Sequence, residues 1–284
     1  MTKPALIIHG GFFTEHQTDP LMKAQKQQAL LRIVREGWEY LQTHTAFETV
    51  VFCSILLEDD PLFNAGTGSQ IQSDGVTRMS AAVCDGTTGR FSGVINIENV
   101  KNPILIASRL QQEEDRVLGG EGALKYAREH GFDYYNPQTD HRIREYEEKR
   151  RSLINTGTIG CVALDFGGAL AAATSTGGKG FELVGRVSDS ATVAGNYANS
   201  WCGVSCTGVG EDIINGAMAA KIVTRVTDGM TLGEALRKTF DEIKPFDGFA
   251  GVIAIDSYGN IGHQDSHPSM VYAWKNRLGE SVFD

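Results

Sequence analysis

Apolar and polar residues follow two spacings along this chain, one typical of helices and one typical of strands. Helical spacing predicts an amphipathic helix over about 21–41, and a more uniformly apolar stretch predicts a buried helix over about 46–57. The apolar run Ala5–Ile8 predicts a strand that leads directly into His9-Gly10-Gly11. The other expected strands cover residues 79–84, 93–97, 158–164, 169–174 and 251–255, and the other expected helices cover residues 103–110, 122–130, 208–224 and 231–243. Runs of strands and runs of helices favour stacked layers over a doubly wound sheet.

A charged segment separates the two halves of the chain. Nine of the twelve residues in 140–151 carry a charge, and both signs are present. This pattern predicts a solvated helix or linker, and the mixed signs give no surface for nucleic acid. Shortly after it comes the step Gly157-Thr158, where a buried strand is expected to begin.

The composition narrows the class of protein. With 284 residues, 41% hydrophobic and 21% charged, the chain can bury a core, and its net charge of −9 argues against nucleic acid as a partner. No apolar run approaches the roughly 18 residues of a membrane span, and the first residues lack the regions of a signal peptide. Five scattered cysteines predict no disulfide framework. We therefore expect a cytoplasmic protein with no membrane partner.

Few familiar catalytic motifs are present. The sequence has no GxSxG elbow, no phosphate-binding GxxxxGK[ST] and no CxxC pair. On a strand, His263, Asp265 and His267 would share one face and could bind a metal. Pro268 follows at once and no second ligand cluster stands elsewhere, so a polar pocket rim or surface loop is the favoured interpretation, with metal-dependent hydrolysis as an alternative.

Four segments gather hydroxyls, backbone donors and charges at turns, where catalytic groups tend to lie. They are residues 155–165, 174–178, 185–190 and 205–211. From the residues alone, Arg186 and Asp189 could form a surface ion pair. Thr207 and Gly208 could begin a helix with Glu211 as a capping-box partner.

In this order, these segments resemble the plant-type (type 2) asparaginases, or isoaspartyl peptidases, of the N-terminal-nucleophile hydrolases. The resemblance runs from IHGG at His9 through NAG at Asn64 to SCTGVGE, residues 205–211. It implies an α+β fold, a four-layer αββα sandwich, in a single domain over 1–284. It also implies self-cleavage between Gly157 and Thr158. The products would be an α subunit, 1–157, with a mobile charged linker over about 139–157, and a β subunit, 158–284, assembled as a dimer of αβ units, a heterotetramer.

The resemblance also assigns roles to single residues. Thr158 becomes the nucleophile after cleavage, and its free α-amine can act as the base. Thr176 orients it, and Thr207 with the Gly208 amide forms the oxyanion hole. Arg186 and Asp189 bind the substrate α-carboxylate and α-ammonium. The supporting positions are Gly210, a backbone contact to the substrate head, Gly10 and Gly11, a flexible glycine turn involved in self-cleavage, and Asn64, a polar neighbour of Thr158.

No organic cofactor is implied. A structural Na⁺ is implied in the Leu57–Gly68 loop. Its ligands would be the backbone carbonyls of Leu57, Glu58, Phe63 and Ala65.

Some positions depart from the family pattern. Phe12 and Phe13 stand where small residues are usual, Ser80 replaces an acidic residue, and residues 266–270 read SHPSM. The expected substrates are β-aspartyl dipeptides and L-asparagine, which differ only in the leaving amine. Discrimination then rests on rim residues such as Phe12, Phe249 and His267. The alternatives are an uncleaved pseudoenzyme that binds an aspartyl ligand, or a relative with another amide substrate such as glycosylasparagine.

Overall fold

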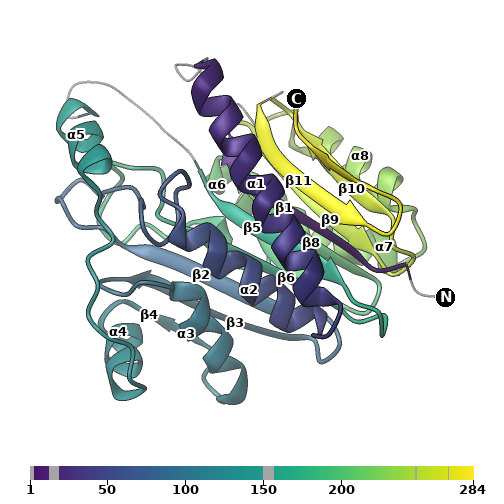
Figure 1. Cartoon of the computed structure of the whole chain (residues 1–284), viewed down its shortest axis with the longest axis horizontal. Helices are drawn as coiled ribbons and strands as arrows, with labels where there is room; N and C mark the ends of the chain where they lie inside the picture. Colours follow the sequence, from purple (N-terminus) through teal and green to yellow (C-terminus); the bar gives the residue numbers. More distant parts are fainter. Residues whose placement is uncertain (1–2, 13–18, 150–156, 247, 268) are drawn as a thin grey trace.

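The computed structural model describes residues 3–12, 19–149, 157–246, 248–267 and 269–284 (Figure 1). Eight strands form the larger sheet in the order β12-β11-β1-β5-β6-β2-β3-β4, and four form the smaller sheet in the order β10-β9-β8-β7. The larger sheet contains β1 (Ala5–Phe12), β2 (Met79–Asp85), β3 (Arg90–Ile97), β4 (Val117–Gly119), β5 (Ile159–Leu164), β6 (Leu170–Thr176), β11 (Met270–Asn276) and β12 (Glu280–Val282). The smaller sheet contains β7 (Asn196–Ala198), β8 (Cys202–Gly208), β9 (Ala250–Asp256) and β10 (Ile261–Asp265).

Helices cover one face of each sheet. Against the larger sheet pack α1 (Pro20–Leu41), α2 (Ala46–Asp59), α3 (Pro103–Arg109) and α4 (Gly120–Glu129), and against the smaller sheet pack α7 (Met218–Thr227) and α8 (Leu232–Ile243). The remaining helices are α5 (Asp140–Lys149) and α6 (Gly210–Gly216). Among the described residues, no helix is both long and apolar enough to cross a membrane.

The alternation of side chains along the strands builds the core in layers. In β1, Leu6 and Ile8 pack among the helices, whereas Ala5 and Ile7 face the smaller sheet. The same alternation puts Val162 of β5 between the sheets. A third apolar cluster joins the smaller sheet to α7 and α8. This arrangement confirms the expected α+β class.

Most predicted elements are present, with three corrections. The helix expected over 208–224 is broken at Ala217, whose φ of +47° places it in the left-handed region, so α6 and α7 are separate. The sequence patterns missed six strands: β4, β7, β10 and β12, which have three to five residues, and the seven-residue strands β8 and β11. The charged segment forms α5, and residues 150–156 of the expected linker lie outside the described residues.

The third correction concerns Gly10 and Gly11, which do not form a turn. Strand β1 continues through both of them to Phe12, and all eight of its residues are buried. The pairing with β11 shifts register between His9 and Phe12, and Gly11 has a φ of +88°. The glycines therefore form an irregularity inside a buried strand, a place where glycine is favoured because it tolerates positive φ.

Alanine substitutions at two helical glycines should change the stability of the protein in opposite directions. A Cβ at Gly37 of α1 would overlap Cys53 Sγ and lie 2.9 Å from Leu6 Cδ2, whereas one at Gly122 of α4 would meet nothing within 4 Å. Gly37→Ala should therefore lower the free energy of unfolding by about 1–3 kcal/mol through overpacking. Gly122→Ala should raise it by about 0.5–1 kcal/mol through helix propensity. Denaturant titration of both variants checks this, and shifts of the same sign would contradict it.

Candidate active site

Thr158 stands at the last position before β5 and is 7% exposed. Its hydroxyl donates to Thr176 Oγ1 at 3.2 Å, and the Thr176 hydroxyl donates in turn to the carbonyl oxygen of Gly157, also at 3.2 Å. The Gly178 amide donates to Thr176 Oγ1 at 3.1 Å. The structure thus brings Gly157, Thr158 and Thr176 together, and it directs the Thr158 proton away from the carbonyl that precedes it.

Asn64 supplies a second donor to the same carbonyl. Its Nδ2 donates to the Gly157 oxygen at 2.5 Å and to the Gly178 oxygen at 2.6 Å, while its Oδ1 accepts from the Gln70 amide at 2.8 Å. Attack by a hydroxyl on the Gly157 carbonyl would place negative charge on the oxygen that Asn64 and Thr176 both face. Donors placed in advance around such an oxygen are an effective way to stabilise that charge.

Gly11 of β1 lies against this bond, whereas Gly10 lies against Phe63. A Cβ at Gly11 would lie 2.9 Å from Gly157 Cα and 3.0 Å from Thr158 N, and a Cβ at Gly10 would overlap the ring of Phe63. A side chain at position 11 would therefore displace the Gly157–Thr158 bond. Gly11 allows the backbone of β1 to approach that bond closely.

Arg186, Asp189 and Gly210 form a second group. A Cβ at Gly210 would lie 2.8 Å from Asp189 Oδ1 and 2.9 Å from Arg186 Nη2. The guanidinium is held by Glu211, with Nε at 2.7 Å from Oε1 and Nη2 at 2.9 Å from Oε2. The simple ion pair between Arg186 and Asp189 is thus wrong, because Glu211 takes the bidentate position. The sequence patterns suggested Glu211 only as a helix-capping residue.

Asp189 is buried beside this ion pair, at 3% exposure. Its Oδ2 has no hydrogen-bond partner within the part of the chain that the structure describes. Burial raises the pKa of Asp189 to about 7, and the positive charge of Arg186 opposes that rise. The site therefore holds a carboxyl whose charge is poorly compensated, next to a guanidinium.

Thr207 and Gly208 end β8. Thr207 is 1% exposed, and its Oγ1 has no hydrogen-bond partner among the described residues. Gly208 has a φ of +134°, and a Cβ there would overlap the carbonyl oxygen of Phe249. Helix α6 begins at Gly210 with Val209 as the N-cap and no side-chain cap. The capping role suggested for Thr207 is therefore wrong.

Comparison with known proteins identifies the family of this chain. A family model described as asparaginase matches residues 2–282. The chain belongs to the asparaginase family. It is 46% identical to an isoaspartyl peptidase/L-asparaginase of Synechocystis sp., over 95% of this chain and 87% of the relative. It is 36% identical to a plant-type L-asparaginase of Pyrococcus furiosus, over 95% of both chains. An isoaspartyl peptidase of Escherichia coli is 34% identical, over 96% of this chain and 93% of the relative. Family membership makes the protein a hydrolase.

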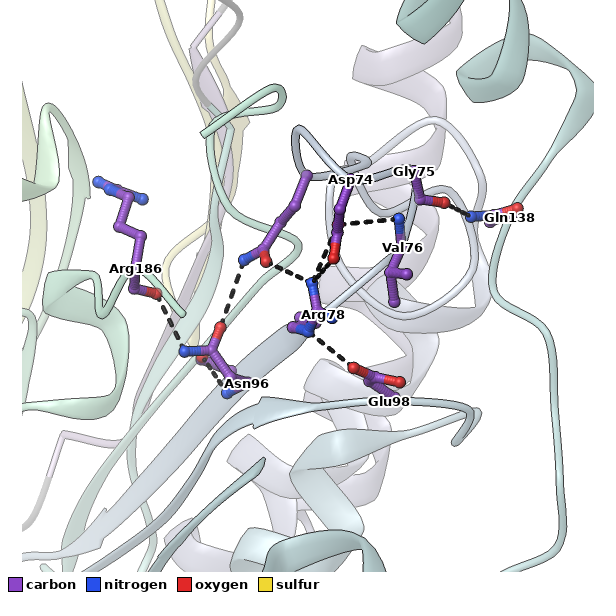
Figure 2. A network of polar contacts seen from close by, with 10 residues as sticks. Asp74, Gly75, Val76, Arg78, Asn96, Glu98, Gln138 and Arg186 are labelled. Carbon is purple, nitrogen blue, oxygen red and sulfur yellow. Dashed lines mark hydrogen bonds and ion pairs between the residues drawn. The ribbon is translucent and has the colours of Figure 1, made fainter. Parts of the chain in front are cut away.

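Polar contacts behind Arg186 anchor its backbone (Figure 2). The side-chain Nδ2 of Asn96 donates to the Arg186 carbonyl at 3.2 Å, and the backbone amide of Asn96 donates to Ser80 Oγ at 3.1 Å. Arg78 joins the same network and forms an ion pair with Glu98 at 2.7 Å. Ser80, the departure noted at an acidic position of the family pattern, thus helps to hold Asn96 in its left-handed conformation, φ +53°. No local sequence signal singled out Asn96.

The aromatic rim residues lie together. The Phe12 ring is 4.8 Å from the Phe249 ring, and the His267 ring is 5.7 Å from Phe249 and 6.4 Å from Phe12. Phe12 is 4% exposed, so it packs between the sheets. Phe249 and His267 are half-buried, so these two residues of the three have side-chain surface that a ligand could contact.

The described residues contain no group of three or more His, Cys, Asp or Glu placed to hold a metal ion. His263 stacks on Tyr272 with ring centroids 4.1 Å apart, and His267 Nδ1 lies 2.8 Å from Ser269 Oγ. These two histidines therefore have aromatic and hydroxyl partners. The geometry gives no support to metal-dependent hydrolysis through His263, Asp265 and His267.

The raised pKa of Asp189 predicts a stabilising substitution. In the unfolded chain this carboxyl titrates near pH 4, and in the folded protein near pH 7. Its ionisation therefore destabilises the native state progressively as the pH rises from 4 to 7. Relative to wild type, Asp189→Asn should gain about 2–4 kcal/mol of stability between pH 4 and pH 8. Denaturant titrations at both pH values measure this.

The control is Asp133→Asn, which changes an exposed carboxyl. It should show no such pH-dependent gain. An Asp189→Asn variant whose stability tracks wild type at both pH values would show that the carboxyl is not destabilising.

Proposed function

We propose that this protein is a self-processing amidohydrolase that cleaves β-aspartyl dipeptides and L-asparagine with Thr158 as its nucleophile. The observation that carries the proposal is the alignment of the Thr158 hydroxyl, the Thr176 hydroxyl and the Gly157 carbonyl. The names of the similar proteins support the substrates, since they include isoaspartyl peptidases and L-asparaginases. The layers of helix and sheet fit a four-layer αββα sandwich of the N-terminal-nucleophile hydrolases.

In the first reaction the protein cleaves itself. Thr158 Oγ attacks the Gly157 carbonyl carbon, and Asn64 and Thr176 donate to the oxygen on which charge develops. The hydroxyl proton goes to the departing amide nitrogen, and the acyl group moves from nitrogen to oxygen. Water then hydrolyses the ester. The products are an α subunit that ends at Gly157 and a β subunit that begins at Thr158 with a free α-amine.

In the second reaction the new α-amine activates the nucleophile. With a pKa near 8, it can take the Thr158 hydroxyl proton at neutral pH. Thr158 Oγ attacks the side-chain amide of the substrate, and the Thr207 hydroxyl and Gly208 amide donate to the resulting oxyanion. The unpartnered state of Thr207 Oγ1 supports this role. The amine leaves with a proton, and water hydrolyses the aspartyl ester on Thr158.

The head group of the substrate binds at Arg186, Asp189 and Gly210. The substrate α-carboxylate is a bidentate acceptor like Glu211, so binding requires the Arg186 guanidinium to share or exchange its partner. The ionised Asp189 accepts from the α-ammonium, which supplies the compensating charge that the buried carboxyl lacks. The leaving amine points toward Phe249 and His267.

The central test is Thr158→Ala. It should abolish both cleavage at Gly157–Thr158 and hydrolysis of substrates, because it removes the attacking oxygen. Denaturing gels over several days, with assays of ammonia and amino-acid release from asparagine and several β-aspartyl dipeptides, measure both. Thr77→Ala, which removes another buried hydroxyl without a partner in the described structure, is the matched control and should cleave and hydrolyse like wild type.

Three results would contradict the proposal. Cleavage at the same bond in Thr158→Ala would show that another group attacks it. A wild-type protein that stays full length and inactive would favour the uncleaved aspartyl-binding protein. Loss of activity in excess chelator would revive metal-dependent hydrolysis.

We propose in addition that the Leu57–Gly68 loop holds a structural Na⁺. Gly66 and Gly68 have φ of +52° and +93°, and the loop folds back so that the carbonyls of Glu58, Pro61 and Phe63 lie against them. Neutral carbonyl oxygens are suitable ligands for a hard cation. The backbone carbonyl oxygens of Leu57, Glu58, Phe63 and Ala65 would be the ligands of the ion. The ion would fix the loop that carries Asn64.

Sodium should therefore stabilise the folded protein. Thermal melts in NaCl, compared with choline chloride at equal ionic strength, should show an advantage in sodium of about 1–2 kcal/mol at concentrations well above Kd. Equal melting temperatures in the two salts would contradict sodium binding.

A further inference from the structure

A second polar layer lies directly beneath the residues of the proposed site. In each of three strands, a polar residue stands two positions before a site residue. In β6 and β8 a spacing of two puts both on the same face, whereas in β1 the register shift after His9 interrupts the alternation. The pairs are His9 and Gly11 in β1, Thr174 and Thr176 in β6, and Ser205 and Thr207 in β8. The polar residues therefore form one layer, and the site residues form the layer above it.

Ser205 contacts both of the other polar residues. His9 Nε2 lies 3.0 Å from Ser205 Oγ, and Ser205 Oγ lies 2.7 Å from Thr174 Oγ1. All three residues are fully buried. Ser205 belongs to the smaller sheet, whereas His9 and Thr174 belong to the larger, so this chain of hydrogen bonds joins the two sheets.

Gly160 places this layer below the nucleophile. It pairs with His9 on one side and with Thr174 on the other, and it lies two residues after Thr158. A Cβ at Gly160 would overlap both Ser205 Oγ and His9 Nε2. The missing side chain therefore provides the space in which the three polar residues meet.

His9 is a neutral member of the layer. Burial lowers its pKa to about 3, although a contact with the Thr158 backbone acts in the opposite direction. The Gly11 amide donates to Nδ1 over a long 3.4 Å, and Nε2 is hydrogen-bonded to Ser205 Oγ. Ser205 Oγ is hydrogen-bonded in turn to Thr174 Oγ1. The layer connects the backbone of Gly11, beside the bond to be cut, with the strand that carries Thr207.

We propose that His9, Ser205 and Thr174 are positioning residues that hold the Thr158 side of the site at a fixed distance from Thr207 and Gly208. This inference rests on the proposed function. Apolar contacts between the sheets are non-directional, whereas hydrogen bonds require defined distances and angles. A small displacement of the oxyanion donors relative to the nucleophile is costly in the transition state and much less so in substrate binding.

The test compares Thr174→Val, which removes the hydroxyl at nearly constant shape, with Thr174→Ser, which keeps it. Thr174→Val and Ser205→Ala should each lower kcat about tenfold, with KM within about twofold of wild type, and should slow self-cleavage to a similar extent. Thr174→Ser should retain most of the wild-type kcat. Melting temperatures are measured for every variant.

Ser92→Ala is the matched control. Ser92 is a fully buried strand serine that donates to the Ala107 carbonyl at 2.6 Å, in β3 and outside the site. It should lose stability like Ser205→Ala but keep kcat and the rate of self-cleavage. This separates positioning from a general loss of stability.

The inference is overturned if Ser205→Ala and Thr174→Val keep wild-type kcat and self-cleavage. Equal losses in Thr174→Ser and Thr174→Val would also overturn it, because the hydroxyl would not matter. If Ser205→Ala does not fold, the two Thr174 variants decide. A wild-type protein without self-cleavage or hydrolysis would instead refute the proposed function, so the two failures are distinguishable.

Discussion

The pairing of β5 with β1 on one side and β6 on the other determines where Thr158 stands. All six residues of β5 are buried, and both neighbours are also buried along their lengths. A slip of one residue would exchange the two faces of β5 and place every side chain in the wrong layer, so the register is strongly specified. Thr158, the residue that precedes this strand, is therefore held in a defined position, as the proposed nucleophile must be.

The site is among the places in the described structure where buried polar atoms lack hydrogen-bond partners. Thr207 Oγ1 and Asp189 Oδ2 are buried without hydrogen-bond partners in the described structure. Each such group costs about 1–3 kcal/mol. A ligand that supplied the missing partners would offset this cost, and the two groups lie near the end of β8 and beside Arg186, where the proposed substrate would bind.

The sequence predicted the long elements well because their apolar periodicity is strong. The helix over about 21–41 agrees with α1 within one residue at its start, and Thr45 with Glu48 forms the capping box that begins α2. Strands such as β10 and β12 were missed because their residues are only partly buried and carry no clear alternation. The break at Ala217 was missed because alanine rarely adopts a left-handed conformation.

For the site, sequence motifs identified which residues come together but not how. The proximity of Thr158, Thr176 and Asn64 was expected, whereas the bidentate contact of Glu211 with Arg186 and the chain from His9 to Thr174 depend on distances between strands far apart in sequence. No spacing along the chain encodes such distances.

Phe12 shows how a departure from the family pattern is accommodated. A large residue beside the glycines suggests a change in the local mobility of β1, but its effect in the structure lies in the other sheet. A Cβ at Gly251 would lie 2.9 Å from Phe12 Cζ, and Gly251 is the pairing partner of Thr207. The ring thus occupies space that the glycine leaves open, next to the strand that carries Thr207 and Gly208. The two sheets are joined there by this apolar contact, which is non-directional. They are also joined by the His9–Ser205–Thr174 hydrogen bonds, which require defined distances and angles. The geometry of the site therefore depends on both kinds of contact.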